Sequence, residues 1–382
     1  MKRPEETMNN PEFTGLPFTT SRPLRIGLDC DDVLYECFSY AIERANRDFG
    51  TNLNVDEVKC WGYSEGDYEK VFPYFGRADF VATQPLIPGA REFIRDLSRM
   101  TGVDIYIITA VPIEVMGERG KSLRKNFPWI DEKHYILSSS KEVSRFDVFV
   151  DDAPHNLFAN QSKYRIVRRH SWNENISGML SYTDFAELKS LIVRILKHER
   201  PTLPEVPGKP FVVALIGPTG AEKNKVASIL CENGFERPRS YTTKENANPE
   251  FYTIIPDEEF RRKRDSGELA ETSVYGTNKF GLAFGDVQKI LDEGKNVVTV
   301  MDMCGAASLS SKYPTVVIYK DKPYHDILKS IIECEDEVEE KVSRIMSLQS
   351  EQSNADLCDY KLDPTESAEI CAARVLNLVR EK

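Results

Sequence analysis

The stretch IGLDCDDVL, Ile26 to Leu34, places three acidic residues directly after a short apolar run. The apolar run predicts a buried β-strand, and Asp29, Asp31 and Asp32 stand where that strand ends. Carboxylates this close together repel one another, so the position calls for a divalent cation, a phosphoryl chemistry, or both. The end of this strand is therefore the first candidate functional site.

Strand-like and helix-like runs alternate through the first half of the chain. The predicted strands are residues 24–29, 103–109, 147–152 and 164–169, and the predicted helices are residues 89–100, 114–127 and 182–199. This alternation predicts an α/β fold with a parallel sheet and helices on both faces. Functional sites in such sheets lie at the carboxyl ends of strands.

Four separated pieces of sequence can meet at that edge of the sheet: the acids Asp29 and Asp31, then Thr109, then Lys141, then the pair Asp151 and Asp152. A phosphoryl-transfer site needs a carboxylate nucleophile, a second acid, a hydroxyl and an ammonium for the phosphate oxygens, and carboxylates for Mg²⁺. In this order the pieces resemble the haloacid dehalogenase-like (HAD) phosphatases, and within them the 5'(3')-deoxyribonucleotidases. The resemblance includes QPLIPGAREFI, IYIITAVP and HYILSSSKEVSRFDVFVDD and covers roughly residues 24–195.

The resemblance implies a Rossmann-like parallel sheet and a role for each residue of the constellation. Asp29 is expected to be the nucleophile that forms an aspartyl-phosphate, and Asp31 the general acid and then the base. Thr109 and Lys141 are expected to hold the phosphate. The expected Mg²⁺ ligands are Asp29, Asp31 through its backbone carbonyl, Asp151 and Asp152.

Two positions depart from the pattern of that family. Ala110 stands where the family usually has serine, which removes one phosphate-facing hydroxyl. Asp32 stands where glycine is common, so the turn is less free to adopt unusual backbone angles.

Residues 35–85 form an insertion rich in aromatic residues, and they resemble the small helical cap of the same family. A cap over the site excludes water and selects the leaving group. Trp61 and Phe80 are candidates for stacking on a base, although most rings in a small helical unit form its core.

Residues 199–210 read ERPTLPEVPGKP, with proline at every third position from 201 to 210. This spacing favours a polyproline II spacer and cannot continue a helix. It divides the chain into a disordered leader (1–22), a phosphatase domain (23–198), a linker (199–210) and a second domain (211–382).

The second half opens with an apolar run and then GPTGAEKNKV, Gly217 to Val226. A strand, a glycine-rich turn and a lysine at a helix start form the layout of a P-loop, which binds phosphates through backbone N–H groups. Gly217, Gly220 and Lys223 fit that layout. Glu222 and Asn224, however, stand where the P-loop pattern has glycine and a hydroxyl residue.

The stretches SYTTKENANPEFYTII, GELAET, VYGTNKFG and VVTVMDMCGAA follow in order and resemble the guanylate kinases, over roughly residues 210–380. The resemblance implies a P-loop α/β domain and a nucleoside-monophosphate pocket. The expected pocket residues are Ser240, Lys244, Tyr252, Glu271, Tyr275, Thr277 and Asp302. Lys244 replaces an arginine of the family, and Glu271 is expected to read the guanine edge.

The expected lid of that domain has lost its cations. Active guanylate kinases carry several arginines there, whereas this chain keeps Arg344 and has an acidic run at residues 335–340. We interpret the run as a solvated helical face. Because such arginines contribute several powers of ten in rate, phosphotransfer from ATP is expected to be very slow.

Composition limits the partners and the compartment. The chain has 382 residues and a net charge of -11, which argues against a protein that grips nucleic acid. Its eight cysteines form no CxxC pair, a reduced intracellular pattern, and no apolar run is long enough for a membrane span. We expect a cytoplasmic protein.

The sequence favours a Mg²⁺-dependent phosphatase of (deoxy)nucleoside monophosphates, joined to a guanylate kinase-like domain that binds a GMP-like ligand or a protein partner. Three different functions stay open beside it. They are a bifunctional nucleotidase and guanylate kinase, a nucleic-acid end-healing enzyme, and a non-catalytic nucleotide-binding scaffold.

Overall fold

The computed structural model describes residues 23–176, 178–199, 210–275 and 277–380. The expected leader and almost all of the proline-rich linker lie outside these residues, so both stay predictions. Across the described ranges, no helix has the length and apolar character needed to cross a bilayer.

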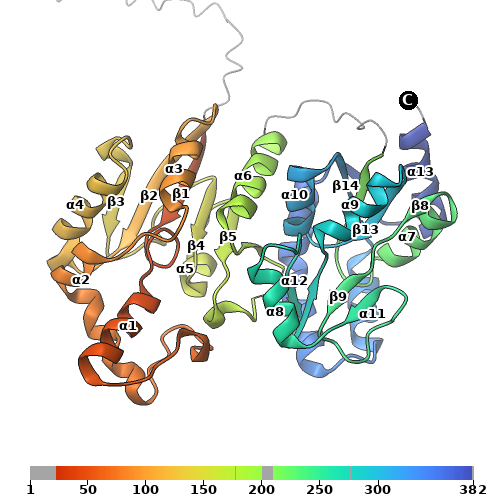
Figure 1. Ribbon diagram of the computed structural model, residues 1–382. Coiled ribbons are helices and arrows are strands. Elements are labelled where there is room, and N and C mark those ends of the chain that lie inside the picture. The colour runs from red at the N-terminus through yellow and green to blue at the C-terminus, as the bar shows by residue number, and fades with distance from the viewer. Residues whose placement is uncertain (1–22, 177, 200–209, 276, 381–382) are drawn as a thin grey trace, which may run out of the picture.

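The first half of the chain forms a six-stranded sheet in the order β3-β2-β1-β4-β5-β6 (Figure 1). Its strands are β1 (Leu24–Asp29), β2 (Val103–Ala110), β3 (Tyr135–Ser138), β4 (Val148–Asp151), β5 (Tyr164–Arg168) and β6 (Leu180–Tyr182). All neighbouring strands are parallel, which confirms the predicted sheet. Four of these strands were predicted from the sequence, whereas β3 and β6 were not.

Helices cover both faces of this sheet. On one face, α3 (Ala90–Ser98) and α6 (Phe185–Glu199) pack in one apolar cluster with β-strand residues such as Val150. On the other face, Leu157 of α5 (Pro154–Ala159) packs with Phe149. Successive residues of β4 thus point to opposite, covered faces, which explains the nearly continuous apolar strands. The helix α4 (Met116–Asn126) lies beside β3.

The predicted helical cap is present and has a core of its own. It consists of α1 (Phe38–Phe49), α2 (Ala78–Thr83) and the 3₁₀ turns η1 (Val55–Glu57), η2 (Gly66–Lys70) and η3 (Phe72–Gly76). Ile42, Tyr68, Tyr74 and Phe80 are buried in this unit, because its aromatic residues pack on one another. The unit forms the red and orange lobe below the sheet in Figure 1.

The second half contains a parallel five-stranded sheet in the order β15-β14-β7-β13-β8. Its strands are β7 (Val212–Ile216), β8 (Phe235–Glu236), β13 (Asn296–Val300), β14 (Thr315–Lys320) and β15 (Tyr360–Leu362). A smaller mixed sheet comprises β10 (Tyr252–Ile254), β9 (Ser240–Thr242), β12 (Asn278–Gly281) and β11 (Ser273–Tyr275).

Seven helices of the described residues belong to this second half: α7 (Lys223–Glu232), α8 (Asp257–Asp265), α9 (Phe284–Asp292), α10 (Met303–Lys312), α11 (Tyr324–Glu333), α12 (Val338–Ser353) and α13 (Ala368–Arg380). The other 3₁₀ turns are η4 (Ile113–Val115), η5 (Glu132–His134), η6 (Ser171–Asn173) and η7 (Asn354–Leu357).

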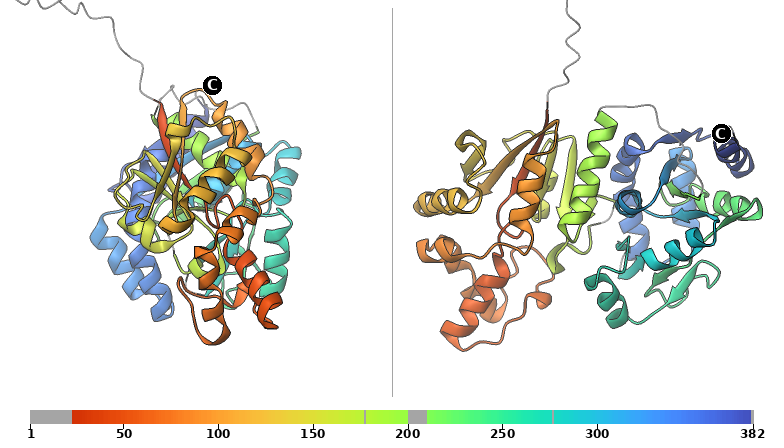
Figure 2. Two further views of the ribbon diagram at one scale, coloured as in Figure 1. Left: turned by 90° about the vertical axis from the view of Figure 1, so that its left-hand side faces the viewer. Right: turned by 45° about the horizontal axis from the view of Figure 1, so that its top comes forward.

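The two halves pack directly against each other. In Figure 1 and in the right-hand view of Figure 2, α6 lies between the first sheet and α10, and the two helices are in contact. One apolar cluster runs from the first sheet through α6 into the second half. At its edge, Arg194 Nε donates to the carbonyl of Leu357 at 2.5 Å, and its guanidinium pairs with Asp359 at 3.0 Å. The halves therefore form one packed body.

Candidate active site and nucleotide pocket

Three buried carboxylates meet at the carboxyl end of the first sheet. Asp29 ends β1, Asp151 ends β4 and Asp152 follows it, and one oxygen of each lies within 4.8 Å of the others. Lys141 Nζ bridges two of them, at 2.7 Å from Asp29 and 2.9 Å from Asp151. Burial, opposed by Lys141, raises the pKa of Asp29, and burial with the charge of Asp151 raises the pKa of Asp152.

This cluster fits the Mg²⁺ ion that the family implies. One ammonium cannot balance three carboxylates, and the donors are all oxygen, the ligand type that Mg²⁺ prefers. Thr109 Oγ1 is fully buried beside the Cys30 thiol and has no hydrogen-bond partner among the described residues. Thr109 is not among the residues that line the cavity at this cluster, so its predicted contact with phosphate stays a prediction.

The Asp31 carboxylate points to other partners than the three clustered acids. Arg119 of α4, itself almost fully buried, donates to Asp31 Oδ1 at 2.6 Å, and Gln84 Nε2 donates to the same oxygen at 2.9 Å. Burial acts to raise the pKa of Asp31, but the Arg119 charge and the Gln84 bond hold it below its usual value. The proposed acid-base residue is thus held in its ionised form. The predicted contact of its backbone carbonyl with Mg²⁺ stays a prediction.

Asp32 takes a left-handed conformation, with φ of 52°, although it carries a side chain. Its carboxylate accepts hydrogen bonds from the backbone N–H of Cys37 at 3.0 Å and Phe38 at 3.1 Å, at the start of α1. These bonds hold the turn in the conformation that glycine would adopt freely. Burial raises the pKa of Asp32 to about 7.

The segment from Arg168 to Asn173, which ends in η6, donates hydrogen bonds to the two loops that carry Asp32 and Asp152. His170 Nε2 donates to the Asp32 carbonyl at 2.8 Å, and burial lowers the pKa of His170 to about 3, so the ring is neutral. Trp172 Nε1 donates to Asp152 Oδ2 at 3.1 Å, and Asn173 Nδ2 donates to the Asp152 carbonyl at 2.8 Å. These bonds hold the backbone at Asp32 and Asp152 and orient the Asp152 carboxylate.

A cavity of about 470 Å³ opens between the carboxylates and the cap. Trp61, Phe80, Ala110 and Lys141 are among the residues that line it. Trp61 is half exposed and lies 5.3 Å from the His155 ring, whereas Phe80 is buried and stacked on Tyr40. Of the two stacking candidates, Trp61 therefore has the freer ring face.

The phosphate-loop residues line a second cavity, of about 370 Å³, at the carboxyl end of β7. Gly217 has a φ of 141°, and a Cβ there would lie 2.0 Å from the Lys320 carbonyl oxygen. Lys223 Nζ donates to the carbonyls of Gly217 at 2.5 Å and Pro218 at 2.7 Å. Burial lowers the pKa of Lys223 to about 8. The lysine that a P-loop directs at phosphate is here bonded to the loop itself.

Glu222 confirms that this loop needs the conformation of its missing glycine. Its φ is 58°, so the chain takes a left-handed conformation with an exposed glutamate. That conformation costs a residue with a Cβ roughly 1–2 kcal/mol. We expect Glu222→Gly to raise the free energy of unfolding by about 1 kcal/mol, after the gain of chain entropy in the unfolded state. Urea titration measures it, and Glu222→Ala, which keeps the Cβ, is the control that should show no such gain.

The structure places most of the remaining predicted pocket residues around the second cavity. Gly220, Ser240, Tyr252, Glu271 and Asp302 line it. Glu271 is buried, accepts a hydrogen bond from the Asp302 backbone N–H at 2.9 Å, and has a pKa raised by burial and by the Asp302 charge.

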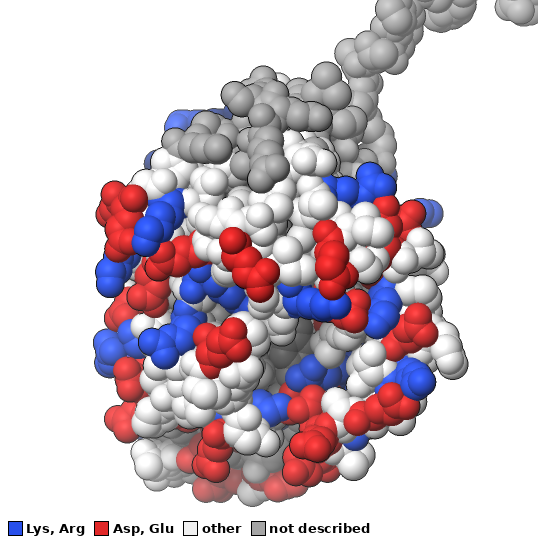
Figure 3. All heavy atoms as spheres, turned by 90° about the vertical axis from the view of Figure 1, so that its right-hand side faces the viewer, with Lys and Arg blue, Asp and Glu red and all other residues white. Residues whose placement is uncertain are grey.

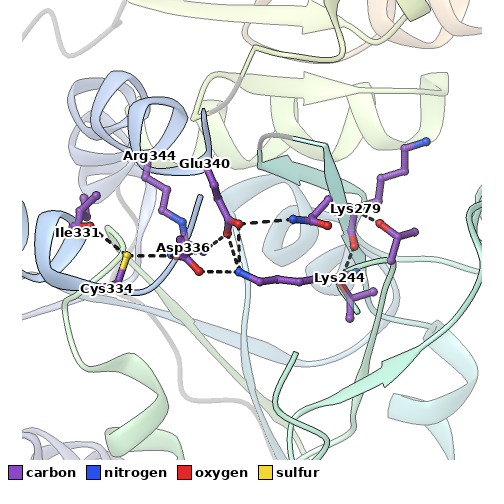
Figure 4. Close-up of polar contacts among 10 residues, drawn as sticks. Lys244, Lys279, Ile331, Cys334, Asp336, Glu340 and Arg344 are labelled. Carbon is purple, nitrogen blue, oxygen red and sulfur yellow. Dashed lines mark hydrogen bonds and ion pairs between the residues drawn. The ribbon is translucent and has the colours of Figure 1, made fainter. Parts of the chain in front are cut away.

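Two predicted residues, Thr277 and Lys244, are not among those that line that cavity, and the prediction for Tyr275 stays untested. Thr277 is exposed, and the side chain of Tyr275 lies outside the described part of the structure. Lys244 is turned toward the acidic run (Figure 4).

The interpretation of that run as a solvated face is wrong for two of its members. Asp336 is half-buried and Glu340 is buried, and both accept bonds from Lys244 Nζ, at 2.6 and 3.0 Å (Figure 4). Arg344 pairs with the same two carboxylates, at 3.2 and 2.5 Å. Lys244 and Arg344, the two cations that the family resemblance assigns to this site, are thus both paired with carboxylates of the protein.

Several residues of both sites were not found by sequence reasoning. They are Gln84, Arg119, Asn156, Arg169, His170, Trp172 and Asn173. Apart from Asn156, which donates to Asp151 only five positions away, each contacts its partner across a sequence distance that no local pattern spans; Arg119, for instance, lies 88 positions from Asp31.

Comparison with known proteins adds relatives for each half. Residues 22–198 match the family described as "5' nucleotidase, deoxy (Pyrimidine), cytosolic type C protein" (NT5C). A 5'(3')-deoxyribonucleotidase of Clostridium acetobutylicum is 24% identical over 176 residues, which are 42% of this chain and 97% of the relative.

Two further relatives are guanylate kinases. That of Thermotoga maritima is 30% identical over 190 residues, 46% of this chain and 87% of the relative. That of Chlamydia felis is 29% identical over 136 residues, and the match spans 33% of this chain and 67% of the relative.

Proposed function

Since the chain belongs to the guanylate kinase family and carries an NT5C-type HAD nucleotidase domain over residues 22–198, we propose that it is a Mg²⁺-dependent phosphatase of (deoxy)nucleoside monophosphates. The guanylate kinase-like half then binds a nucleotide without efficient phosphotransfer. The observation that carries the proposal is the group of Asp29, Asp151 and Asp152, bridged by Lys141, under an aromatic cap.

In the first step, an oxygen of the Asp29 carboxylate attacks the phosphorus of the substrate, and the bond from phosphorus to the nucleoside oxygen breaks. Asp31, which has to take up a proton before this step, passes it to the departing oxygen, so an aspartyl-phosphate and a nucleoside result. In the second step, Asp31 removes a proton from water, which attacks the phosphorus. The bond between phosphorus and the Asp29 oxygen breaks, inorganic phosphate leaves, and Asp31 keeps the proton for the next cycle. Arg119 and Gln84 hold Asp31 in the ionised form that this second step uses.

Asp29, Asp151 and Asp152 would hold Mg²⁺, which would stabilise the negative charge on the phosphate oxygens. Lys141, which lines the cavity, would bind those oxygens as well, and Thr109 keeps the phosphate-binding role that the family resemblance implies. The cap excludes water from the cavity while the phosphoryl group is transferred.

For the second half, the cavity beside Glu271 and Asp302 supports binding of a nucleoside monophosphate with hydrogen-bond donors on its base. The neutralised Lys244 and Arg344 and the self-bonded Lys223 argue against rapid transfer from ATP. These contacts favour a binding role for this half over a bifunctional enzyme.

A nucleic-acid end-healing enzyme and a scaffold without activity are both less well supported. On the face of the second half seen in Figure 3, acidic and basic side chains are interspersed, which does not favour the grip on a phosphate backbone that end healing needs. The complete first constellation disfavours a scaffold without activity. We also propose the domain limits 23–198 and 211–382 and a cytoplasmic location.

A phosphatase screen of the full chain over nucleoside monophosphates tests the proposal. We expect phosphate release with Mg²⁺, a loss of at least about a hundredfold when EDTA removes the metal, and recovery when Mg²⁺ is added back. Absence of Mg²⁺-dependent release across ribo- and deoxyribonucleotides, 5' and 3', would exclude the proposed activity.

A further inference from the structure

The cavity of about 370 Å³ in the second half has a wall that belongs to the first half. Arg169 and Met179 line it from the nucleotidase side, and Lys223, Glu271 and Asp302 line it from the other. A ligand in this cavity therefore touches both halves of the chain.

Close backbone packing holds that wall in place. Gly178 lies so near to Ser347 of α12 that a Cβ on Gly178 would lie 2.6 Å from the Ser347 carbonyl oxygen. Nearby, the backbone N–H of Ser181 donates to Cys304 Sγ at 3.2 Å. Together with the α6–α10 contact, these interactions make the shared wall a fixed part of the cavity.

Arg169 brings a cation to the acidic end of the cavity. Glu271 and Asp302 lie there, and burial raises the pKa of each carboxyl. Arg169 lines the cavity together with both residues, and its charge opposes the rise in the pKa of Asp302. A guanine base suits this mixture, because its N1 and N2 donate to carboxylates and its O6 and N7 accept from arginine.

Arg169 is also joined to the first active site by two hydrogen bonds in series. Its Nη1 donates to the Asn173 carbonyl at 3.1 Å, and Asn173 Nδ2 donates to the Asp152 carbonyl at 2.8 Å. The flanking residues make similar bonds: Arg168 Nη1 to the Val33 carbonyl at 3.0 Å, and His170 to the carbonyl of Asp32. Arg169 is thus connected by direct contacts to the loops that carry the catalytic acids.

We propose that a guanine nucleoside monophosphate bound in this cavity contacts Arg169 of the nucleotidase half and thereby regulates phosphatase turnover. This inference rests on the proposed nucleotide binding by the second half and adds a residue and a regulatory path to it.

Binding is tested by calorimetric titration of GMP into the full chain with Asp29→Asn, which prevents hydrolysis. Adding Glu271→Gln to this background shows which part of the measured binding heat comes from GMP in the shared cavity, because that part should be lost. We expect Arg169→Ala to weaken that binding at least about tenfold and Arg169→Lys to weaken it less. Arg124→Ala, which removes an exposed arginine from the same half away from the cavity, is the matched control and should bind as the parent does.

The outcomes separate the two proposals. Undiminished binding by a folded Arg169→Ala variant overturns the shared site and leaves the proposed function standing. No saturable binding to the parent overturns the shared site and the proposed nucleotide binding by the second half, whereas the proposed phosphatase activity is decided by the phosphatase screen. Thermal unfolding of each variant checks its fold, and Arg169→Lys provides the test if Arg169→Ala does not fold.

Regulation is tested on the active chain with deoxyuridine monophosphate as substrate and the methylene phosphonate analogue of GMP, which phosphatases cannot hydrolyse, as effector. We expect the saturating analogue to change kcat at least about fivefold, a change that a competitor at the first site cannot produce. The response should be absent in Arg169→Ala and preserved in Arg124→Ala. An unchanged kcat with the cavity fully occupied overturns the regulatory path.

Discussion

Phosphatase turnover should fall at least about a thousandfold in Asp29→Asn, because an amide cannot attack phosphorus as the carboxylate does. Asp29 ends β1, is buried, and lies 2.7 Å from Lys141, so no neighbouring carboxylate can take its place without moving the strand. The measurement is phosphate release from the best nucleotide of the screen, at saturating substrate and Mg²⁺.

The fold of this variant should persist. Burial and the charge of Asp151 already disfavour an ionised Asp29, and Lys141 keeps its 2.9 Å bond to Asp151 after the substitution. Asp104→Asn makes the same change at a half-exposed position of β2 and should leave turnover at the wild-type level. Wild-type turnover in a folded Asp29→Asn protein would contradict the proposed nucleophile.

The elements that set up this prediction were visible in the sequence because their signals are local. Leu24–Asp29 is an apolar run that ends in acids, and Val148–Asp151 repeats that pattern. Parallel strands carry their carboxyl ends to one edge, so the meeting of Asp29 with Asp151 followed from the alternation of strands and helices. The substitution of glycine by Asp32 and Glu222 was also visible, and both residues do take positive φ angles.

The features that the sequence did not predict, the burial of Arg119, Asp336 and Glu340, depend on contacts between distant segments. Arg119 lies in a helix that otherwise reads as an ordinary charged surface helix, and only the fold shows that its side chain is buried against Asp31. Asp336 and Glu340 belong to a run of acids that local charge patterning assigns to solvent. They turn inward because Lys244, some 92 positions earlier, offers a half-buried cation. A run of acidic residues reads the same in the sequence whether its side chains face solvent or pair with a cation from a distant segment.

The inward turn of Asp336 and Glu340 leads to the second large expected effect, which concerns phosphotransfer. With ATP, GMP and Mg²⁺, we expect the chain to form ADP and GDP at least about a thousandfold more slowly than the guanylate kinase of Thermotoga maritima assayed beside it. Arg344 and Lys244 are paired with carboxylates, and Lys223 is bonded to the carbonyls of its own loop. None of the three is therefore directed at a transferred phosphoryl group.

The assay is best made with Asp29→Asn, so that the phosphatase half does not consume GMP, and with both products separated by chromatography. The double variant Asp336→Asn with Glu340→Gln tests the cause. It releases Lys244 and Arg344 from their ion pairs and should bind GMP more tightly. It should still fail to transfer phosphate, because Glu222 and Asn224 remain where the P-loop needs glycine and a hydroxyl for ATP and its metal. Formation of GDP by the parent chain at a rate within about tenfold of the Thermotoga enzyme would instead establish a bifunctional enzyme, since lid arginines contribute far more than that factor.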